Sequence, residues 1–369
     1  MVAGSYELNH DREYYAIRAA AGLIDVSPLY KYLIRGRDAV AFLDRLVTRN
    51  VARCAEGQVL YTPWCDETGK VMDDGTLARL GEEAFRLTAA EPTLRWLLDN
   101  ATGFQVTIDD ITESTAALAL QGPSAREILG CVADADMDGL RYFRSVAAQI
   151  RGIPVSISRT GYTGDLGYEI WVAAEDAEPL WDALMDGGLA YGITPTGILA
   201  LDVARIEAGL ILLDVDYVPA HHALIESRKS SPFELGLGWT VKLDKGPFVG
   251  SGALQREKSE GSTWQLRGLD VDWESLERVY GEFGLPPQLP MIAWRTSVPV
   301  YDGGRQVGYA TSGCWSPILK KYIVLAHLQT AHARLGNALQ MEVTVEHQRK
   351  RAAASVAETP FFNPERKRA

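Results

Sequence analysis

The sequence predicts an α+β protein that ends in an all-β domain, and three observations support this prediction. Short strand-like and helix-like patterns alternate irregularly through residues 1–250, and no internal repeat is recognisable. The chain becomes polar around residues 258–263, and strand patterns separated by turn signals dominate after that point. The length of 369 residues suits two or three domains. We therefore expect a first domain at residues 1–255 and a second at residues 264–369.

Composition and charge exclude several classes of protein. Hydrophobic residues make up 47% of the chain and charged residues 23%, which excludes a disordered or collagen-like chain. The formal net charge of −11 would repel polyanions, so binding to nucleic acid or to an anionic membrane is not expected. No signal peptide or bilayer-spanning apolar stretch is recognisable, so a cytoplasmic protein is expected. Reduced and mostly packed thiols are expected at Cys54, Cys65, Cys131 and Cys314.

Two helices and two hairpins are predicted in the first domain from the spacing of its side chains. Apolar residues recur at three- and four-residue steps in both helices, and Asp38 precedes the first helix as a favourable N-cap. Each hairpin joins two strand-like segments through a link that contains glycine. The helices are expected at residues 39–47 and 175–185, and the hairpin strands at 58–66 with 70–80 and at 155–159 with 168–172.

Two segments of the second domain are predicted to lack regular structure. Pro286, Pro287 and Pro290 cannot continue a strand ladder or a helix interior, so residues 271–292 are expected to form an inserted loop. The basic residues at 366–368 are expected to form a solvated tail.

The acidic doublet Asp73-Asp74 lies in one of the predicted strands. Successive side chains of a strand point to opposite faces, so the two carboxylates cannot form a paired-carboxylate site. A carboxylate among apolar neighbours is costly to bury unless something binds it, such as an amine donor of a ligand. The alternative is an aspartate at a turn or a sheet edge, and the spacing alone does not decide between the two.

The link at residues 158–169 carries three glycines together with Tyr162 and Glu169. Glycines permit backbone geometry that other residues resist, so this link could hold an aromatic ring and an acid over a pocket. The alternative is an ordinary tight hairpin with a surface tyrosine. The glycine spacing fits neither a Walker phosphate loop nor a dinucleotide-binding fingerprint.

Asp202 and Arg205 share one face of a helix predicted at residues 196–208. The pair predicts either a side-chain ion pair or an arginine that clamps a ligand carboxylate, and both alternatives stay open. No metal site is predicted, because the adjacent His221 and His222 cannot easily converge on one ion. Three tryptophans are expected in the core in preference to cofactor platforms, namely Trp64, Trp239 and Trp315.

Taken together, these segments resemble the aminomethyltransferase family, which includes the T-protein of the glycine cleavage system. The resemblance covers nearly the whole chain in order, and its specific pieces are residues 158–169 and 232–242. The other matching pieces are residues 22–27, Tyr61-Thr62 with Asp73-Asp74, residues 121–123, Asp202 with residues 205–208, residues 311–317 and residues 360–362.

The resemblance implies a folate-binding body, a carboxy-terminal β-barrel and a channel that binds tetrahydrofolate. It implies that Asp74 is the catalytic acid at the reactive end of folate, and that Tyr61, Tyr162, Glu169 and Arg205 line the folate site. Glu169 would accept hydrogen bonds from the pterin, whose amine and amide groups are donors. An aminomethyl or methyl group would then pass from a donor to N5 of tetrahydrofolate, with Asp74 stabilising the positive charge. No metal or covalent nucleophile is required.

Departures from the T-protein pattern leave the donor open. Asp66 and Gly69-Lys70 stand where that family usually has an asparagine and a Gly-Gly pair, so the folate end matches better than the donor end. The expected partner is a small-molecule donor or a lipoyl carrier protein. One alternative is a tetrahydrofolate-dependent demethylase of a methyl ether, sulfonium compound or methylamine, with Tyr30, Trp64 and the two histidines as a donor wall. The others are a non-catalytic folate-binding protein and a domain of a flavin-linked dehydrogenase.

Overall fold

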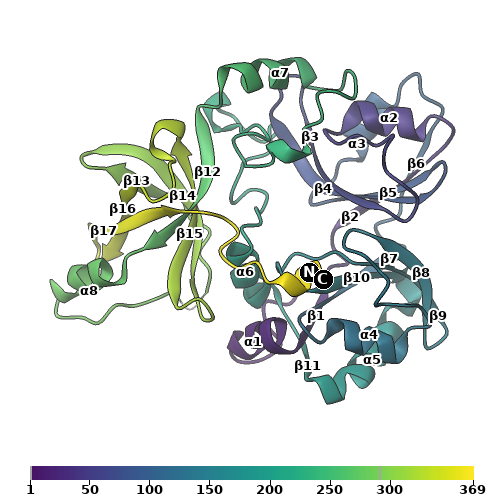
Figure 1. Cartoon of the computed structure of the whole chain (residues 1–369), viewed down its shortest axis with the longest axis horizontal. Coiled ribbons are helices and arrows are strands. Elements are labelled where there is room, and N and C mark those ends of the chain that lie inside the picture. The colour runs from purple at the N-terminus through teal and green to yellow at the C-terminus, as the bar shows by residue number, and fades with distance from the viewer. Residues whose placement is uncertain (1, 291) are drawn as a thin grey trace.

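The chain forms two β-sheets with helices and a closed β-barrel, which confirms the predicted α+β class and the all-β carboxy-terminal part (Figure 1). The computed structural model describes residues 2–290 and 292–369. Helix α6 (Ile198–Glu207) lies where the barrel meets the rest of the molecule, and it packs against the barrel strands and against α1 (Asp11–Ala19). No helix in the described part of the chain has the length and apolar character needed to cross a bilayer.

The first sheet has six strands in the order β11-β1-β7-β10-β9-β8. One face packs on α4 (Ala125–Val132) and α5 (Ala177–Gly188), and the other face contributes Ile24 and Ala119 to a core shared with α1 and α6. The predicted hairpin and the helix near residue 180 are both confirmed here. The strands are β1 (Ala21–Asp25), β7 (Thr115–Gln121), β8 (Ser145–Ile150), β9 (Ile153–Ser158), β10 (Gly167–Ala173) and β11 (Ile193–Pro195).

The second sheet has five antiparallel strands in the order β3-β4-β5-β2-β6, and its core includes side chains of α2 (Ala39–Leu46) and α3 (Leu94–Asn100). The predicted hairpin is the β3–β4 pair. The predicted helix is α2, but Asp38 does not cap it, because its carboxylate accepts the backbone N–H of Gln105 at 2.7 Å. The strands are β2 (Tyr30–Arg35), β3 (Val59–Cys65), β4 (Val71–Gly81), β5 (Ala84–Ala89) and β6 (Thr107–Asp110).

The barrel closes because β12 pairs with both β15 and β17. Helix α7 (Ser251–Glu260) precedes the barrel in the chain. The barrel strands are β12 (Trp264–Val271), β13 (Val298–Asp302), β14 (Arg305–Ser316), β15 (Lys321–Gln329), β16 (Ala338–Val345) and β17 (Gln348–Ala357).

The inserted loop predicted at residues 271–292 is only partly correct. Its first half forms α8 (Trp273–Gly281), whose N-cap Asp272 accepts the backbone N–H of Ser275 at 2.7 Å. The three prolines follow the helix, so they do not interrupt it. Met291 lies outside the described residues.

The predicted solvated tail is only partly correct: Arg368 is exposed, but the end of the chain docks on the link between β9 and β10, on α1 and on α6. Arg366 Nε lies 2.7 Å from Oδ1 of Asp165, whose side chain is fully buried. Phe362 donates its backbone N–H to the carbonyl of Glu207, and the Arg18 guanidinium lies 4.5 Å from the Phe362 ring centroid.

Glu207, the last residue of α6, ties that helix to α1 and to the barrel. Its side chain is buried, and it accepts hydrogen bonds from Tyr14 and Arg18 of α1 and from Ser316 of β14. Cys54, Cys65 and Cys314 are buried free thiols as expected, whereas Cys131 is exposed.

Candidate functional site

The acidic doublet lies in β4 with its two carboxylates on opposite faces, as predicted. Asp73 is buried, and its two oxygens accept the backbone N–H groups of Asp74 at 2.7 Å and of Glu91 at 3.2 Å. Burial, followed by the charge of Asp74, raises the pKa of Asp73 to about 8. Asp74 is the partly exposed member of the pair and faces a different set of residues.

Two tyrosine hydroxyls hold the Asp74 carboxylate. Tyr61 donates to Oδ2 at 2.7 Å, and Tyr217 donates to Oδ1 at 2.5 Å. Tyr61 shares a face with Asp74 because Pro63, two residues along β3, is the direct partner of Asp74 across the hairpin. Burial raises the pKa of Asp74, while the hydrogen bonds from Tyr217 and Tyr61 lower it by stabilising the charged form.

Tyr217 reaches Asp74 from a segment at residues 210–217 that follows α6, and Asp216 anchors that segment. One oxygen of Asp216 accepts the hydroxyls of Thr311 and Ser312 on β14, and the other contacts Arg205 of α6. The segment is therefore held by the barrel and by α6 at the residue before Tyr217. Asp216 and Tyr217 are not among the site residues predicted from the sequence, since an adjacent Asp and Tyr within a mostly apolar segment carry no distinctive signal.

Arg205 forms ion pairs, which resolves the choice that its spacing left open. Its side chain is buried, its Nε donates to Asp202 at 2.7 Å, and its Nη1 contacts Asp216. Two carboxylates already neutralise the guanidinium, so Arg205 is not free to clamp a ligand carboxylate. Its Nη2, however, is buried and has no hydrogen-bond partner in the described part of the chain.

The side chain of Gln121 forms hydrogen bonds with three residues of the link at residues 158–169. The Gln121 amide donates to the carbonyls of Thr160 and Tyr168 at 3.3 Å each, and its oxygen accepts the Thr163 hydroxyl at 2.9 Å. A Cβ at either Gly161 or Gly167 would come within 2.2 Å of that oxygen, so a larger residue at either position would have to displace the Gln121 amide. The glycines therefore serve a close approach of Gln121, and the link is more than an ordinary tight turn.

Tyr162 and Glu169 project from this link toward different partners. Tyr162 donates its hydroxyl to the carbonyl of Ile211, so it too holds the segment that carries Tyr217. Glu169 accepts the Thr160 hydroxyl on Oε2 at 2.6 Å, and its Oε1 has no hydrogen-bond donor among residues 2–290 and 292–369. Burial raises the pKa of Glu169, against the lowering effects of Thr160 and Arg86.

Arg86 is a further site residue that the sequence did not reveal. It is buried, its guanidinium lies 3.7 Å from the Trp171 ring centroid, and its Nε has no hydrogen-bond partner within the described ranges. Burial lowers the pKa of Arg86 to about 10, with an opposing effect from Glu169. An arginine in the middle of β5 looks like an ordinary solvent-facing strand residue in the sequence.

The three tryptophans differ in environment. Trp64 is fully buried as expected, and Trp315 is partly buried against Trp273. The expectation is wrong for Trp239, which is 55% exposed and has its ring stacked on Tyr61 with centroids 6.2 Å apart. An exposed indole face thus lies beside the tyrosine that binds Asp74.

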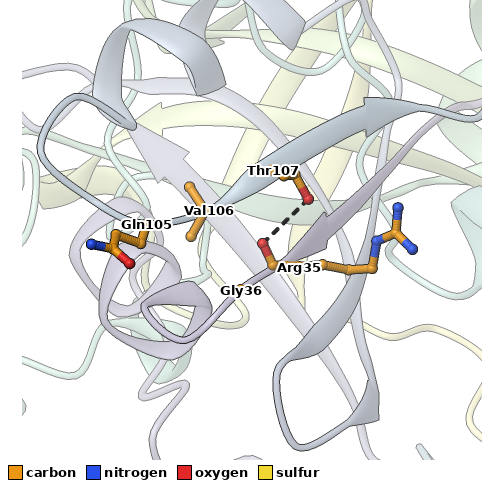
Figure 2. Close-up of a pocket in the computed structure, with 5 residues that line it drawn as sticks. All are labelled: Arg35, Gly36, Gln105, Val106 and Thr107. Atoms are coloured by element: carbon orange, nitrogen blue, oxygen red, sulfur yellow. Dashed lines mark hydrogen bonds between the residues drawn. The ribbon is translucent and has the colours of Figure 1, made fainter.

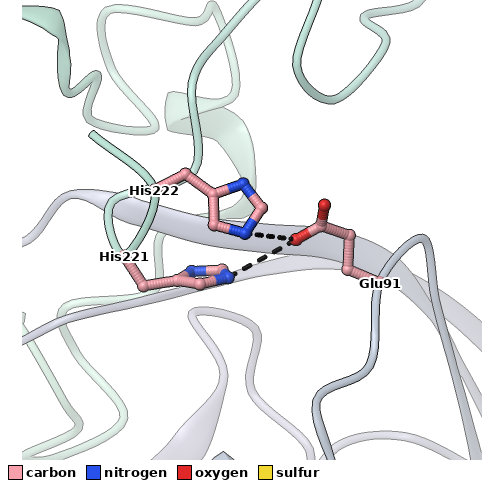
Figure 3. Close-up of side chains that lie close together, drawn as sticks. All are labelled: Glu91, His221 and His222. Carbon is pink, nitrogen blue, oxygen red and sulfur yellow. Dashed lines mark ion pairs between the residues drawn. The ribbon is translucent and has the colours of Figure 1, made fainter. Parts of the chain in front are cut away.

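His221 and His222 converge on Glu91, contrary to the expectation that adjacent histidines diverge (Figure 3). A turn brings them together, because the backbone N–H of His222 bonds to the carbonyl of Pro219 and the two rings meet edge to face at 4.3 Å. Both Nε2 atoms point to the same carboxylate oxygen of Glu91, at 3.4 and 3.2 Å.

A separate hollow of about 350 Å³ lies at the β2–β6 edge of the second sheet (Figure 2). It is lined by Arg35, Gly36, Gln105, Val106 and Thr107. These residues bring no carboxylate or tyrosine hydroxyl to the hollow, so it is distinct from the site around Asp74.

Comparison with known proteins gives matches along most of the chain. Residues 4–245 match the GCVT N-terminal domain, and residues 283–363 match the glycine cleavage T-protein C-terminal barrel domain. The aminomethyltransferase of Halothermothrix orenii is 34% identical over 354 residues, which cover 95% of this chain and 90% of that protein. The aminomethyltransferase of Bacillus cereus is 36% identical over 356 residues, with 95% and 89% covered. The crystal structure of the glycine cleavage system aminomethyltransferase T from Bartonella henselae matches with a TM-score of 0.83 and 26% identity, covering 98% of this chain and 92% of that one.

Proposed function

The chain belongs to the aminomethyltransferase family of glycine cleavage T-proteins, and from that premise we propose that it moves an aminomethyl group from a donor to N5 of tetrahydrofolate. Membership confirms the resemblance inferred from the sequence motifs. The chain also spans about nine-tenths of the length of these relatives. The observation that carries the proposal is the Asp74 carboxylate held between two tyrosine hydroxyls.

The chemistry of the site residues fits a reduced folate. A pterin carries both hydrogen-bond donors and acceptors, and the site offers unmet groups of both kinds. Oε1 of Glu169 is an acceptor without a donor in the described ranges, and Nη2 of Arg205 and Nε of Arg86 are buried donors without acceptors there. The exposed face of Trp239 suits a flat ring.

Asp74 is the residue to which we assign the catalytic role. Tetrahydrofolate, when bound, would supply the two nitrogens that bond to the donor's methylene carbon, while the carbon–sulfur and carbon–nitrogen bonds of the aminomethyl group break and the free thiol and ammonia leave. The Asp74 carboxylate provides negative charge at a site partly shielded from water, where it stabilises developing positive charge better than it would in bulk water. Hydrogen bonds from Tyr61 and Tyr217 favour the ionised form of this carboxylate and fix its orientation.

Arg205, Tyr162 and Asp216 are positioning residues in this proposal. They hold residues 210–217 by an ion pair and by a hydrogen bond to the Ile211 carbonyl, and so fix Tyr217 against Asp74. In this proposal Arg205 positions residues 210–217 and also lines the folate site through its Nη2.

We propose an aminomethyl-lipoyl carrier protein as the donor, in line with the glycine cleavage system protein that matches this fold. The departures at the donor end have structural explanations. Asp66 accepts the backbone N–H groups of Thr68 and Lys70 in the β3–β4 turn, and Lys70 Nζ lies 2.8 Å from Oε2 of Glu234. Trp64 is fully buried and cannot form part of a donor wall. The demethylase alternative and the cytoplasmic location stay predictions.

The test is an anaerobic turnover assay with tetrahydrofolate and an aminomethyl-lipoyl carrier protein, which measures the folate product and released ammonia. We expect Asp74→Asn to lower turnover at least about 100-fold, as for other preorganised charge-stabilising groups, while calorimetry still detects folate binding. The matched control is Asp109→Asn, a surface aspartate paired only with Arg35. Full turnover by Asp74→Asn would contradict the catalytic role.

The same assay separates the alternative functions. Methyl-tetrahydrofolate formed only from small methylated donors would favour the demethylase, and folate binding without turnover of any donor would favour the non-catalytic alternative.

A further inference from the structure

We propose that Glu91, His221 and His222 form a binding site for a divalent transition metal ion, with Zn²⁺ as the ion that their spacing fits. This inference goes beyond the proposed function and does not depend on it. The three ligand atoms lie within 4.8 Å of one another (Figure 3). Two imidazoles with one carboxylate are a ligand set that such ions prefer.

Two of the distances between the ligand atoms match the edges of a tetrahedral ion, and the third, between the two histidine nitrogens, lies within 4.8 Å. Nε2 of His221 and of His222 lie 3.4 and 3.2 Å from Oε2 of Glu91. Zinc bonds of about 2.0–2.1 Å give tetrahedral edges of about 3.3–3.4 Å. An octahedral ion with similar bond lengths would need edges of about 2.9 Å. A charge-assisted N–H···O hydrogen bond would be about 2.7–2.9 Å long, so the observed contacts exceed that range as well.

A second carboxylate, that of Asp214, lies on the side of the His222 ring that faces away from Glu91. Oδ2 of Asp214 lies 3.5 Å from Nδ1 of His222, the nitrogen that faces away from Glu91. Histidine ligands commonly donate this second N–H to a carboxylate, which fixes the tautomer and the ring orientation. Asp214 therefore lies on the side of His222 where such a carboxylate stands in histidine metal sites, at a distance somewhat longer than a hydrogen bond.

The backbone on both sides of the cluster is anchored. The N–H of Glu91 bonds to Asp73 at 3.2 Å, and the N–H of Ala220 bonds to the Val71 carbonyl at 2.8 Å. Both anchors belong to β4, so the ligands are positioned by the same strand that carries the acidic doublet. The histidine side chains are 41% and 40% exposed, which lets an ion enter from solvent without unfolding. Three protein ligands leave a fourth tetrahedral position open.

Calorimetric titration of Zn²⁺ into tag-free, chelator-stripped protein tests this proposal. All proteins carry Cys131→Ser, because that exposed thiol could bind zinc on its own. We expect one Zn²⁺ per chain, and at least tenfold weaker binding in Glu91→Gln and in His222→Asn. Asp214→Asn should weaken binding about tenfold, the usual effect of removing a carboxylate behind a histidine ligand.

His332→Asn is the matched control. His332 forms an isolated pair with Asp302 in the barrel at 2.8 Å and is not part of a three-ligand cluster. Its loss should leave the affinity for Zn²⁺ unchanged. Thermal melts without metal check that each variant is folded, and only proteins with the intact cluster should gain stability from Zn²⁺. Wild-type binding no tighter than that of folded Glu91→Gln, or an equal loss in His332→Asn, would overturn the site. Folate is absent throughout, so failure here leaves the proposed function untouched.

Discussion

Replacing Tyr217 by phenylalanine removes one of the two hydroxyls that stabilise ionised Asp74. A hydrogen bond to a charged group contributes about 1.5–3 kcal/mol, and one pKa unit corresponds to 1.36 kcal/mol. The pKa of Asp74 should therefore rise by about 1–2 units in Tyr217→Phe. Burial already raises this pKa above the usual carboxylate range. Because the ionised form is the active one, turnover is lost as the pH falls through the pKa, and the variant should lose it at a higher pH.

The assay is the pH profile of kcat/KM for tetrahydrofolate, whose acid limb reports ionisation in the free enzyme. Tyr61→Phe should move the limb in the same direction, since Tyr61 donates to the other oxygen of Asp74. The control is Tyr301→Phe, which alters a tyrosine–carboxylate contact with Glu342 in the barrel and should leave the limb in place. An acid limb that stays fixed in both site variants, or that moves to lower pH, would refute the assignment of Asp74.

Three further predictions concern separate parts of the molecule. Burial lowers the pKa of Lys245 from 10.5 to about 8, so between these pH values the unfolded chain binds more protons than the folded chain. The free energy of unfolding measured by urea titration should therefore rise with pH over that window. Lys245→Met should abolish this rise. Glu207→Gln leaves the buried Arg18 without its closest carboxylate partner and should destabilise the fold by about 3–5 kcal/mol in chemical denaturation. Trp239→Ala should weaken folate binding by about three- to tenfold in calorimetry, because one aromatic contact contributes about 0.5–1.5 kcal/mol. The substitution should not lower the melting temperature, because the Trp239 side chain is exposed.

Local periodicity predicted the parts of the site that one strand or one hairpin determines. The two-residue period of a strand placed Asp73 and Asp74 on opposite faces, and the structure has one buried and one partly exposed. Contacts between distant segments were not predictable in this way. Tyr217 meets Asp74 across 143 positions of the chain, and Arg18 meets Glu207 across 189. The motif match placed Arg205 near the site, but its partner Asp216 lies outside the helix that the pattern revealed.

The errors have equally specific causes. Asp272 is a helix-capping residue in the sequence, but the prolines after residue 285 predict a loop, and α8 ends before they begin. Neighbouring side chains diverge in a regular strand or helix, so the sequence predicts that His221 and His222 point apart. In the structure a turn at Pro219 brings the two rings together. Arg366 of the basic tail binds the buried carboxylate of Asp165. The sequence did not predict this ion pair, because Asp165 becomes buried only in the complete fold.

The barrel takes part in the site through Asp216 and its neighbour Tyr217. Thr311 and Ser312 of the barrel bind one oxygen of Asp216, while Arg205 binds the other, so this carboxylate is satisfied only when the barrel and α6 are docked together. Tyr217 is the next residue, and its hydroxyl stabilises the charge on Asp74. The pKa of the proposed catalytic acid in the second sheet thus depends on how a separate all-β unit is seated. This dependence gives a physical reason for the barrel to accompany the folate-binding body in a single chain.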